Sequence, residues 1–155
     1  MITVKTYATS EISDNLLQFA VISAKFEGKW VFCRHKKRST WEIPGGHRET
    51  GEDITDSARR ELYEETGAKV FDLTQICVYS ASDGNGIGYG MLYLADIKEF
   101  DPLPEEFEIG EISFFDDCPD NLTYPEIQGF IHKFISDWAA DREEQCHKKS
   151  FSEVV

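Results

Sequence analysis

The chain has no paired cysteines and no long apolar run. Its four cysteines (Cys33, Cys77, Cys118 and Cys146) lie far apart, with no CxxC spacing, which argues against a disulfide framework and against a zinc site. No stretch approaches the roughly 18–20 apolar residues of a membrane-spanning helix. Residues 1–7 also lack the basic and then apolar layout of a secretory signal. The sequence therefore predicts a cytoplasmic protein with reduced thiols and no membrane partner.

Basic residues are scarce. There are 16 Lys and Arg against 29 Asp and Glu, which gives a net charge of −13 at pH 7. So acidic a protein repels nucleic-acid phosphates at long range, so we expect no nucleic-acid polymer as partner. An enzyme for a small phosphorylated molecule remains compatible with this charge if cations screen the contact. The length of 155 residues fits one domain, and 41% hydrophobic residues exclude a disordered chain.

Apolar patterns predict strands on both sides of a helix. Five strands are expected, at residues 16–26, 30–33, 70–79, 89–97 and 111–115. Gly28 is expected in a hairpin turn between the first two strands. A helix is predicted at residues 53–66, because Ile54, Ala58 and Leu62 fall on one face and Gly67 follows at the position of a C-cap.

A second helix is predicted after Thr123, which forms a capping box with Glu126. Its apolar stripe contains Ile127, Phe130, Ile131, Phe134, Ile135 and Trp138. From Ala139 onward the chain is polar and is expected to fray, so we divide it into a single domain, residues 1–140, and a polar tail, residues 141–155. Strands before, between and after two helices predict an α/β fold in which a mixed β-sheet is covered on both faces.

The segment 46–68, GHRETGEDITDSARRELYEETGA, carries the pattern with the most chemistry. Glu61, Glu64 and Glu65 stand at i, i+3 and i+4, so their carboxylates share one helix face. Hard divalent cations such as Mg²⁺ prefer oxygen ligands of this kind. Arg60 lies four residues before Glu64 and can orient its carboxylate. The alternative, for any Glu-rich helix, is a solvated and charged surface.

This segment resembles a known family motif, the Nudix box GX5EX7REUXEEXGU, in which U is apolar. The matching residues are Gly46, Glu52, Arg60, Glu61, Leu62, Glu64, Glu65, Gly67 and Ala68. The resemblance covers every fixed position of the box, and Pro44 and Gly45 directly before it are similar to the family as well. A Nudix hydrolase is an α/β/α sandwich that cleaves a nucleoside diphosphate linked to another moiety, with Mg²⁺ or Mn²⁺ as cofactor.

The resemblance also implies roles for residues of the box. It implies that Glu61, Glu64 and Glu65 are the metal-binding and base-positioning carboxylates, and that the Gly46 carbonyl is a further metal ligand. Arg60 would orient the carboxylates. In the same comparison, Glu52 would brace the turn between the loop and the helix.

Signals outside the box are weaker. Arg34 closes the second hairpin strand and is expected to face phosphate, or else to be a surface cation. Trp41 and Tyr79 are expected either to stack on a base or to belong to the core. Glu106 is our choice for the further metal-binding Glu that family members often supply from a later loop. Its competitors for this role are Glu105, Glu108 and Glu111. We interpret the basic residues Lys36, Lys37 and Arg38 as a solvated loop.

The resemblance therefore implies a metal-dependent pyrophosphohydrolase for a small nucleotide. The expected substrate is a nucleoside triphosphate, such as an oxidised purine dNTP, cleaved to the monophosphate and pyrophosphate. Nucleotide sugars, dinucleoside polyphosphates and RNA 5′ ends remain open, because base and sugar selection lies outside the box. A Nudix-like domain that senses a nucleotide without turning it over is the rival class. Many relatives are dimers, so a homodimer also remains open.

Overall fold

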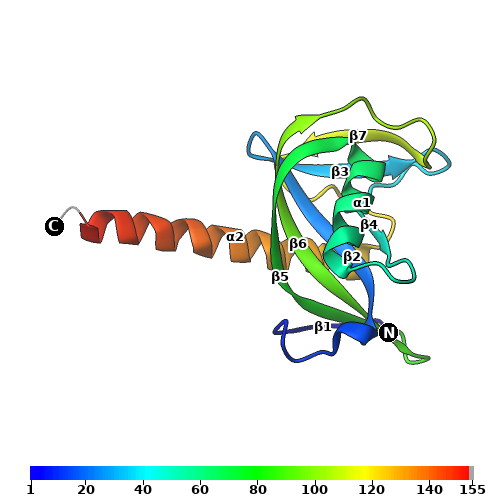
Figure 1. The fold of residues 1–155 in the computed structure, drawn as a ribbon, viewed down its shortest axis with the longest axis horizontal. Coiled ribbons are helices and arrows are strands. Elements are labelled where there is room, and N and C mark those ends of the chain that lie inside the picture. Colours follow the sequence, from blue (N-terminus) through cyan, green and yellow to red (C-terminus); the bar gives the residue numbers. More distant parts are fainter. Residues whose placement is uncertain (154–155) are drawn as a thin grey trace.

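The computed structural model describes the backbone of residues 1–153 and the side chains of residues 1–145. Seven strands form one sheet, with helices on both of its faces (Figure 1). The strands are β1 (Thr3–Tyr7), β2 (Leu17–Phe26), β3 (Lys29–His35), β4 (Gly45–His47), β5 (Ala68–Ser82), β6 (Ile87–Phe100) and β7 (Ile109–Phe115). The helices are η1 (Asp14–Leu16), α1 (Ile54–Thr66) and α2 (Pro125–Glu153). The predicted α/β class with a mixed sheet is confirmed.

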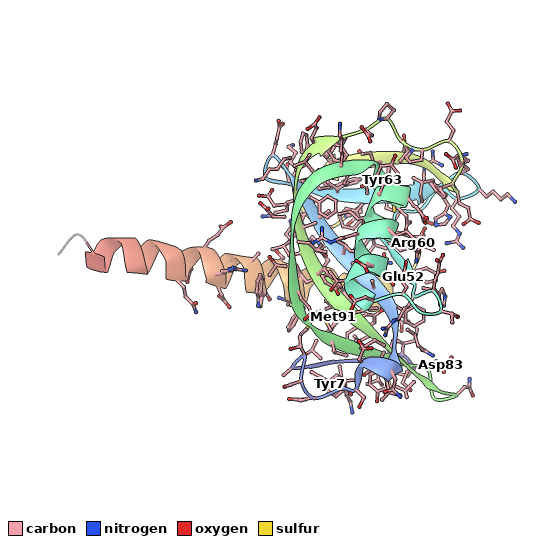
Figure 2. The ribbon with its side chains drawn as sticks, in the orientation of Figure 1. Tyr7, Glu52, Arg60, Tyr63, Asp83 and Met91 are labelled. Carbon is pink, nitrogen blue, oxygen red and sulfur yellow. The ribbon has the colours of Figure 1, made fainter. Side chains whose placement is uncertain are left out.

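The strand order is β1-β5-β6-β2-β3-β7, and the short β4 pairs with β2. Only β2 and β6 run parallel among the pairs described; the others are antiparallel. The predicted hairpin is present, with Glu27 and Gly28 both at positive φ (51° and 81°). Two such residues form the turn that matches the twist of a tight hairpin. β5 and β6 are longer than predicted, because their pairing continues to the hairpin loop at Asp83, labelled in Figure 2.

Each face of the sheet has its own core. On one face, Ile54, Ala58 and Leu62 of α1 pack against β2, β3 and β6. On the other face, Ile131 and Ile135 of α2 pack against a cluster that includes Phe32 and Leu92. The stripe predicted for the second helix is thus buried at its centre, although Phe130 stays 41% exposed. The three layers make the α/β/α sandwich that the resemblance implies.

Helix α2 differs from the prediction at both ends. The predicted capping box is wrong, because the helix begins at Pro125 and the Thr123 hydroxyl pairs instead with that of Thr40, at 2.6 Å. A proline at the first helical position has no N–H to cap. At its other end the helix continues as far as Glu153, into the residues that the sequence predicts as a polar tail, and residues 139–145 are of helix-compatible types. The helix extends away from the sheet (Figure 1). No helix of the described residues is long and apolar enough to cross a membrane.

Candidate active site

Helix α1 is fixed at both ends by its own sequence. Asp53 caps its first turn by accepting the Thr55 N–H at 2.8 Å, and Gly67 ends it at φ 77°. Because Ile54, Ala58 and Leu62 are buried against the sheet, the face that carries Glu61 and Glu64 turns toward β4. The helix thereby holds its carboxylates beside the glycine turn at residues 45–46.

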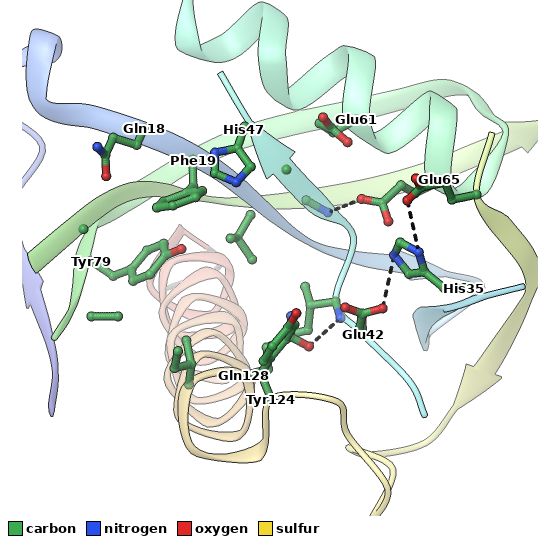
Figure 3. A pocket seen from close by; sticks show the side chains of 18 of the residues that line it. Gln18, Phe19, His35, Glu42, His47, Glu61, Glu65, Tyr79, Tyr124 and Gln128 are labelled. Carbon is green, nitrogen blue, oxygen red and sulfur yellow. Dashed lines mark hydrogen bonds and ion pairs between the residues drawn. The ribbon is translucent and has the colours of Figure 1, made fainter. Parts of the chain in front are cut away.

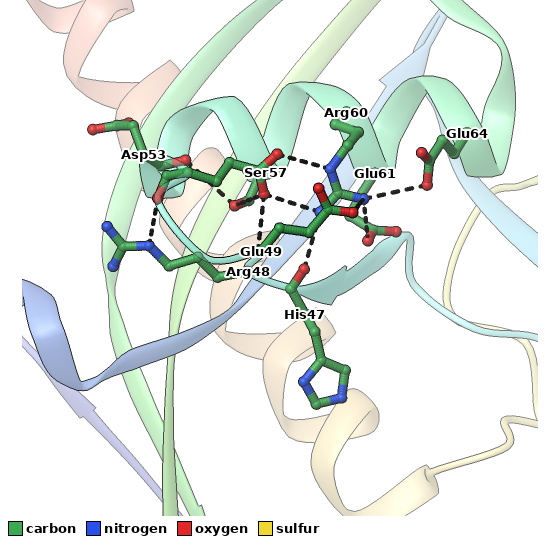
Figure 4. Close-up of polar contacts among 9 residues, drawn as sticks. His47, Arg48, Glu49, Asp53, Ser57, Arg60, Glu61 and Glu64 are labelled. Atoms are coloured by element: carbon green, nitrogen blue, oxygen red, sulfur yellow. Dashed lines mark hydrogen bonds and ion pairs between the residues drawn. The ribbon is translucent and has the colours of Figure 1, made fainter.

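Arg60 is the hub of the polar contacts on this face (Figure 4). One of its nitrogens, Nη1, donates to Glu61 Oε1 at 2.8 Å and to Glu64 Oε2 at 3.3 Å. Its Nε and Nη2 donate to the two oxygens of Glu52 at 2.8 and 3.0 Å. Nη2 also donates to the His47 carbonyl at 3.0 Å. One guanidinium thus connects three carboxylates and the β4 backbone, and these partners raise the pKa of Arg60 further.

Glu52 ties the loop after β4 to the helix. Its carboxylate accepts from Arg60 and Ser57, and these hydrogen bonds lower its pKa from the ordinary 4.5 to about 2. It also accepts the Glu49 N–H at 3.2 Å. Figure 2 shows Glu52 and Arg60 next to each other at the helix. These contacts join the loop after β4 to helix α1, as expected for Glu52.

Gly46 and Glu61 are in close approach. A Cβ on Gly46 would lie 2.4 Å from the carboxyl carbon of Glu61, so no larger residue fits here without displacing that carboxylate. Glu65 lies deeper and accepts the Gly45 N–H at 2.9 Å and the Cys33 thiol at 3.4 Å. Burial raises the pKa of Glu65 to about 8. Burial and the neighbouring Glu61 also raise the pKa of Glu64.

The donor set fits a hard divalent cation. Glu61, Glu64, Glu65 and Gly46 line one cleft, and oxygen ligands such as theirs suit Mg²⁺ or Mn²⁺. Within the described residues, no three side chains of His, Cys, Asp or Glu form a ready-made metal cluster. Arg60 bridges one oxygen of Glu61 and one of Glu64.

A cleft of about 1470 Å³ begins at these carboxylates and continues around β4. Its walls come from α1, from β2 and β5, from the β5–β6 hairpin loop and from the first turn of α2 (Figure 3). This volume is larger than a typical small-ligand pocket of roughly 300–1000 Å³. It joins the acidic face of α1 to a more apolar surface under α2, which suits a ligand with a charged and an uncharged end.

Two of the weaker candidates line this cleft and two do not. Tyr79 and Glu106 line it, as does the competing Glu108. Arg34 is not among the lining residues, because its Nε pairs with Glu111 of β7 at 3.1 Å. Trp41 also lies outside, packed on Phe115 with ring centroids 5.3 Å apart. The expectations for Arg34 and Trp41 as substrate contacts are therefore not supported by their positions.

Arg38 and His35 line the cleft, although the sequence interpretation assigned Arg38 to a solvated loop. Arg38 Nη1 donates to Glu42 Oε1 at 3.1 Å, and its guanidinium lies over the Tyr124 ring, 6.0 Å from the centroid. His35 lies between two carboxylates: its Nε2 is 3.3 Å from Glu42 Oε2, and its Nδ1 is 3.4 Å from Glu108 Oε2. The one sequence feature that could have indicated the Arg38–Glu42 pair is their separation of four residues.

Comparison with known proteins agrees with this geometry. The family model described as NUDIX domain matches residues 16–137. A Bacillus subtilis protein provisionally named an 8-oxo-dGTP diphosphatase is 32% identical over 112 residues, covering 72% of this chain and 70% of that protein. The ADP-ribose pyrophosphatase of Bacillus subtilis is 35% identical over 99 residues, or 61% of this chain and 52% of that protein.

Solved structures show the same fold. The crystal structure of a Bacillus subtilis pyrophosphohydrolase superposes with a TM-score of 0.67 at 28% identity. The superposition covers 77% of this chain and 75% of that one. The sequence motif, the fold and the similar proteins therefore agree with one another.

Proposed function

Because this chain belongs to the Nudix family and is a Nudix pyrophosphohydrolase, we propose that it hydrolyses a nucleoside triphosphate to the monophosphate and pyrophosphate. The observation that carries the proposal is the Arg60 network, which holds Glu52, Glu61 and Glu64 together beside the Gly46 turn. The match to a relative provisionally named an 8-oxo-dGTP diphosphatase supports a triphosphate, an oxidised purine dNTP included.

The groups that we propose to hold Mg²⁺ or Mn²⁺ are Glu61, Glu64, Glu65 and the Gly46 carbonyl. We propose Glu106, which lines the same cleft, as a further ligand. A bound divalent ion supplies charge neutralisation and a lower pKa for bound water. Nudix hydrolases generally use such metals, and the net charge of −13 makes neutralisation necessary before a polyphosphate can approach.

Proton transfer fits Glu64 better than Glu65. Glu65 is buried, and its two oxygens accept from Gly45 N–H and the Cys33 thiol. The Glu64 side chain is 24% exposed in the cleft and receives one contact from Arg60, at 3.3 Å. We therefore assign to Glu64 the acceptance of the proton from the attacking water, and to Glu65 a fixed position behind it.

Arg38 is the residue that we propose for the terminal phosphates. The other arginine of the cleft, Arg60, already pairs with Glu52, Glu61 and Glu64. The Arg38 side chain is 43% exposed, and among the side chains that the structure describes Glu42 is the one carboxylate with which it pairs. Its planar guanidinium can therefore bind phosphate oxygens in pairs.

We also propose that residues 1–140 act as one catalytic domain in the cytoplasm. Cys33, Cys77 and Cys118 are free thiols, which supports a reducing compartment.

The test is product analysis on a nucleotide panel. The purified protein is incubated with dGTP, 8-oxo-dGTP, ADP-ribose and a diadenosine polyphosphate, with Mg²⁺ or with a chelator, and the products are separated by ion-exchange chromatography. We expect monophosphate and pyrophosphate from a triphosphate, only with the metal, and a loss of this activity in Glu64→Gln. Thermal stabilisation by nucleotides without any product would instead show a sensor. Turnover of ADP-ribose alone would refute the triphosphate assignment.

A further inference from the structure

The loop between β6 and β7, residues 101–108, carries the glutamate that we propose as a further metal ligand. The structure separates it from its competitors. Glu111 and Glu108 each lie beside a basic side chain of β3, and Glu105 is not among the residues that line the cleft. Glu106 lines the cleft, and no side chain that the structure describes forms an ion pair with it. Its carboxylate is therefore the one on this loop that can turn to a cation in the cleft.

Lys36, directly after β3, binds the loop on both sides of Glu106. Its ammonium group donates to the Glu105 carbonyl at 3.0 Å, and its backbone N–H donates to the Glu108 carbonyl at 2.8 Å. The loop reaches the end of β3 in this way (Figure 1), although Lys36 and Glu105 are 69 residues apart in the chain. Because the two carbonyls flank Glu106, one lysine fixes the short segment that presents its carboxylate.

The rest of the loop has little polar support. At its start, the Asp101 N–H donates to the Gly67 carbonyl at the end of α1, at 2.8 Å. Two prolines follow, and they have no N–H to donate. Among the hydrogen bonds of the described residues, the one from the Lys36 ammonium is the only one that reaches residues 102–107. This ammonium therefore supplies the polar contact that holds the backbone beside Glu106.

Lys36 itself does not face the substrate. It is exposed and is not among the residues that line the cleft, whereas its neighbours His35 and Arg38 are. Its ammonium is directed to a backbone carbonyl of the loop and not to the cleft. Any effect of Lys36 on a metal ion must therefore pass through the loop, which distinguishes it from a phosphate-binding cation.

We propose that Lys36 is a positioning residue, which holds Glu106 in place for the divalent ion through the Glu105 carbonyl. The proposal rests on the function proposed above, because it takes Glu106 to be a ligand. Removing a residue that orients a metal ligand typically weakens metal binding about 10–100-fold. The sign of the effect is informative, because removing a positive charge would by itself strengthen the binding of a cation.

The experiment measures Mn²⁺ affinity and not turnover. Free Mn²⁺ is determined by electron paramagnetic resonance while each protein is titrated in the presence of a non-hydrolysable triphosphate analogue, and the Mn²⁺ bound by the analogue alone is subtracted. Lys36→Met keeps the length of the side chain without its ammonium, and we expect about tenfold weaker binding. Lys36→Arg can still donate to a carbonyl and restores the affinity.

Lys37→Met is the matched control. Lys37 is the next residue, is equally exposed and forms no ion pair or hydrogen bond with the side chains that the structure describes. The variant loses the same charge from the same part of the chain. It should therefore bind Mn²⁺ at least as tightly as wild type does, and weaker binding in Lys36→Met alone cannot come from the change in charge.

A double-mutant cycle with Glu106→Gln tests whether Lys36 acts through that glutamate. Glu106→Gln should weaken Mn²⁺ binding at least as much as Lys36→Met does, and adding Lys36→Met to it should have no further effect. Additive losses would mean that Lys36 acts elsewhere. A general loss of stability would also weaken binding in both backgrounds, so the cycle distinguishes positioning from misfolding.

Three further results would overturn the proposal. Unchanged Mn²⁺ affinity in Lys36→Met would remove the positioning role. If Glu106→Gln binds Mn²⁺ as tightly as wild type does, Glu106 is not a ligand and the proposal fails, although hydrolysis at the α1 carboxylates stands. If wild type binds no Mn²⁺ beyond that held by the analogue, the proposed function itself fails, and the positioning role fails with it.

Discussion

Replacing Glu52 by Gln removes one negative charge from the Arg60 network while keeping the shape of the side chain. Both Glu52 oxygens accept from Arg60, at 2.8 and 3.0 Å, and its side chain is 15% exposed. The pKa of Glu52 falls from 4.5 to about 2. With about 1.4 kcal/mol for each pH unit, this shift corresponds to at most about 3 kcal/mol of folding free energy. Water around the pair screens it, so we expect a loss of about 1–3 kcal/mol at pH 7.

The sign of the pH dependence follows from the lowered pKa of Glu52. Its stabilisation is fully present above pH 4.5, the pKa of the unfolded chain, and is lost as the pH falls toward about 2. The difference in unfolding free energy between wild type and Glu52→Gln should therefore shrink between pH 7 and pH 3, by more than half. Urea unfolding followed by circular dichroism at both pH values measures it. If wild type and Glu52→Gln differ in unfolding free energy by the same amount at pH 7 and at pH 3, the stabilisation does not come from the ionised carboxylate.

The remaining predictions concern catalysis. Glu64→Gln should lower kcat about a hundredfold or more without changing the melting temperature, because this side chain is partly exposed in the cleft. Gly46→Ala should raise the Mg²⁺ concentration for half-maximal rate about tenfold, because its Cβ would lie 2.4 Å from the Glu61 carboxylate. Arg38→Ala should raise KM for a triphosphate about fivefold or more, whereas Lys69→Ala, which pairs with Glu99 and Asp101 outside the cleft, should leave KM unchanged.

Opposite results would be informative in each case. Near-normal turnover in Glu64→Gln would remove its assignment as proton acceptor. An unchanged Mg²⁺ dependence in Gly46→Ala, with the variant folded, would mean that the turn and Glu61 do not hold the ion. Equal KM values for the Arg38 and Lys69 variants would leave the terminal phosphates without their proposed partner.

Features determined by neighbouring residues were predictable from the sequence. Helix α1 appears where it was expected because its capping residue, apolar stripe and terminal glycine all lie within 53–67. The contacts of Arg60 with Glu61 and Glu64 follow from their spacing on that helix.

Features determined by distant residues were not predictable. Arg34 is not among the residues that line the cleft, and it pairs with Glu111, which lies 77 residues further along the chain and comes beside it because β3 pairs with β7. The partner of Glu65, Cys33, likewise lies 32 residues earlier, on β3. The start of α2 was predicted wrongly for a different reason. The helix begins at Pro125, so that Thr123 and Glu126 do not form the predicted capping box.

The central claim is that the carboxylates of α1 and the Gly46 turn hold a divalent ion against the substrate phosphates. Crystals grown with Mn²⁺ and a non-hydrolysable triphosphate analogue test it directly through the anomalous scattering of manganese. We expect a peak within coordination distance of Glu61, Glu64 or Glu65 and of a phosphate oxygen. A bound analogue with no peak there, or with manganese held only elsewhere, would contradict it.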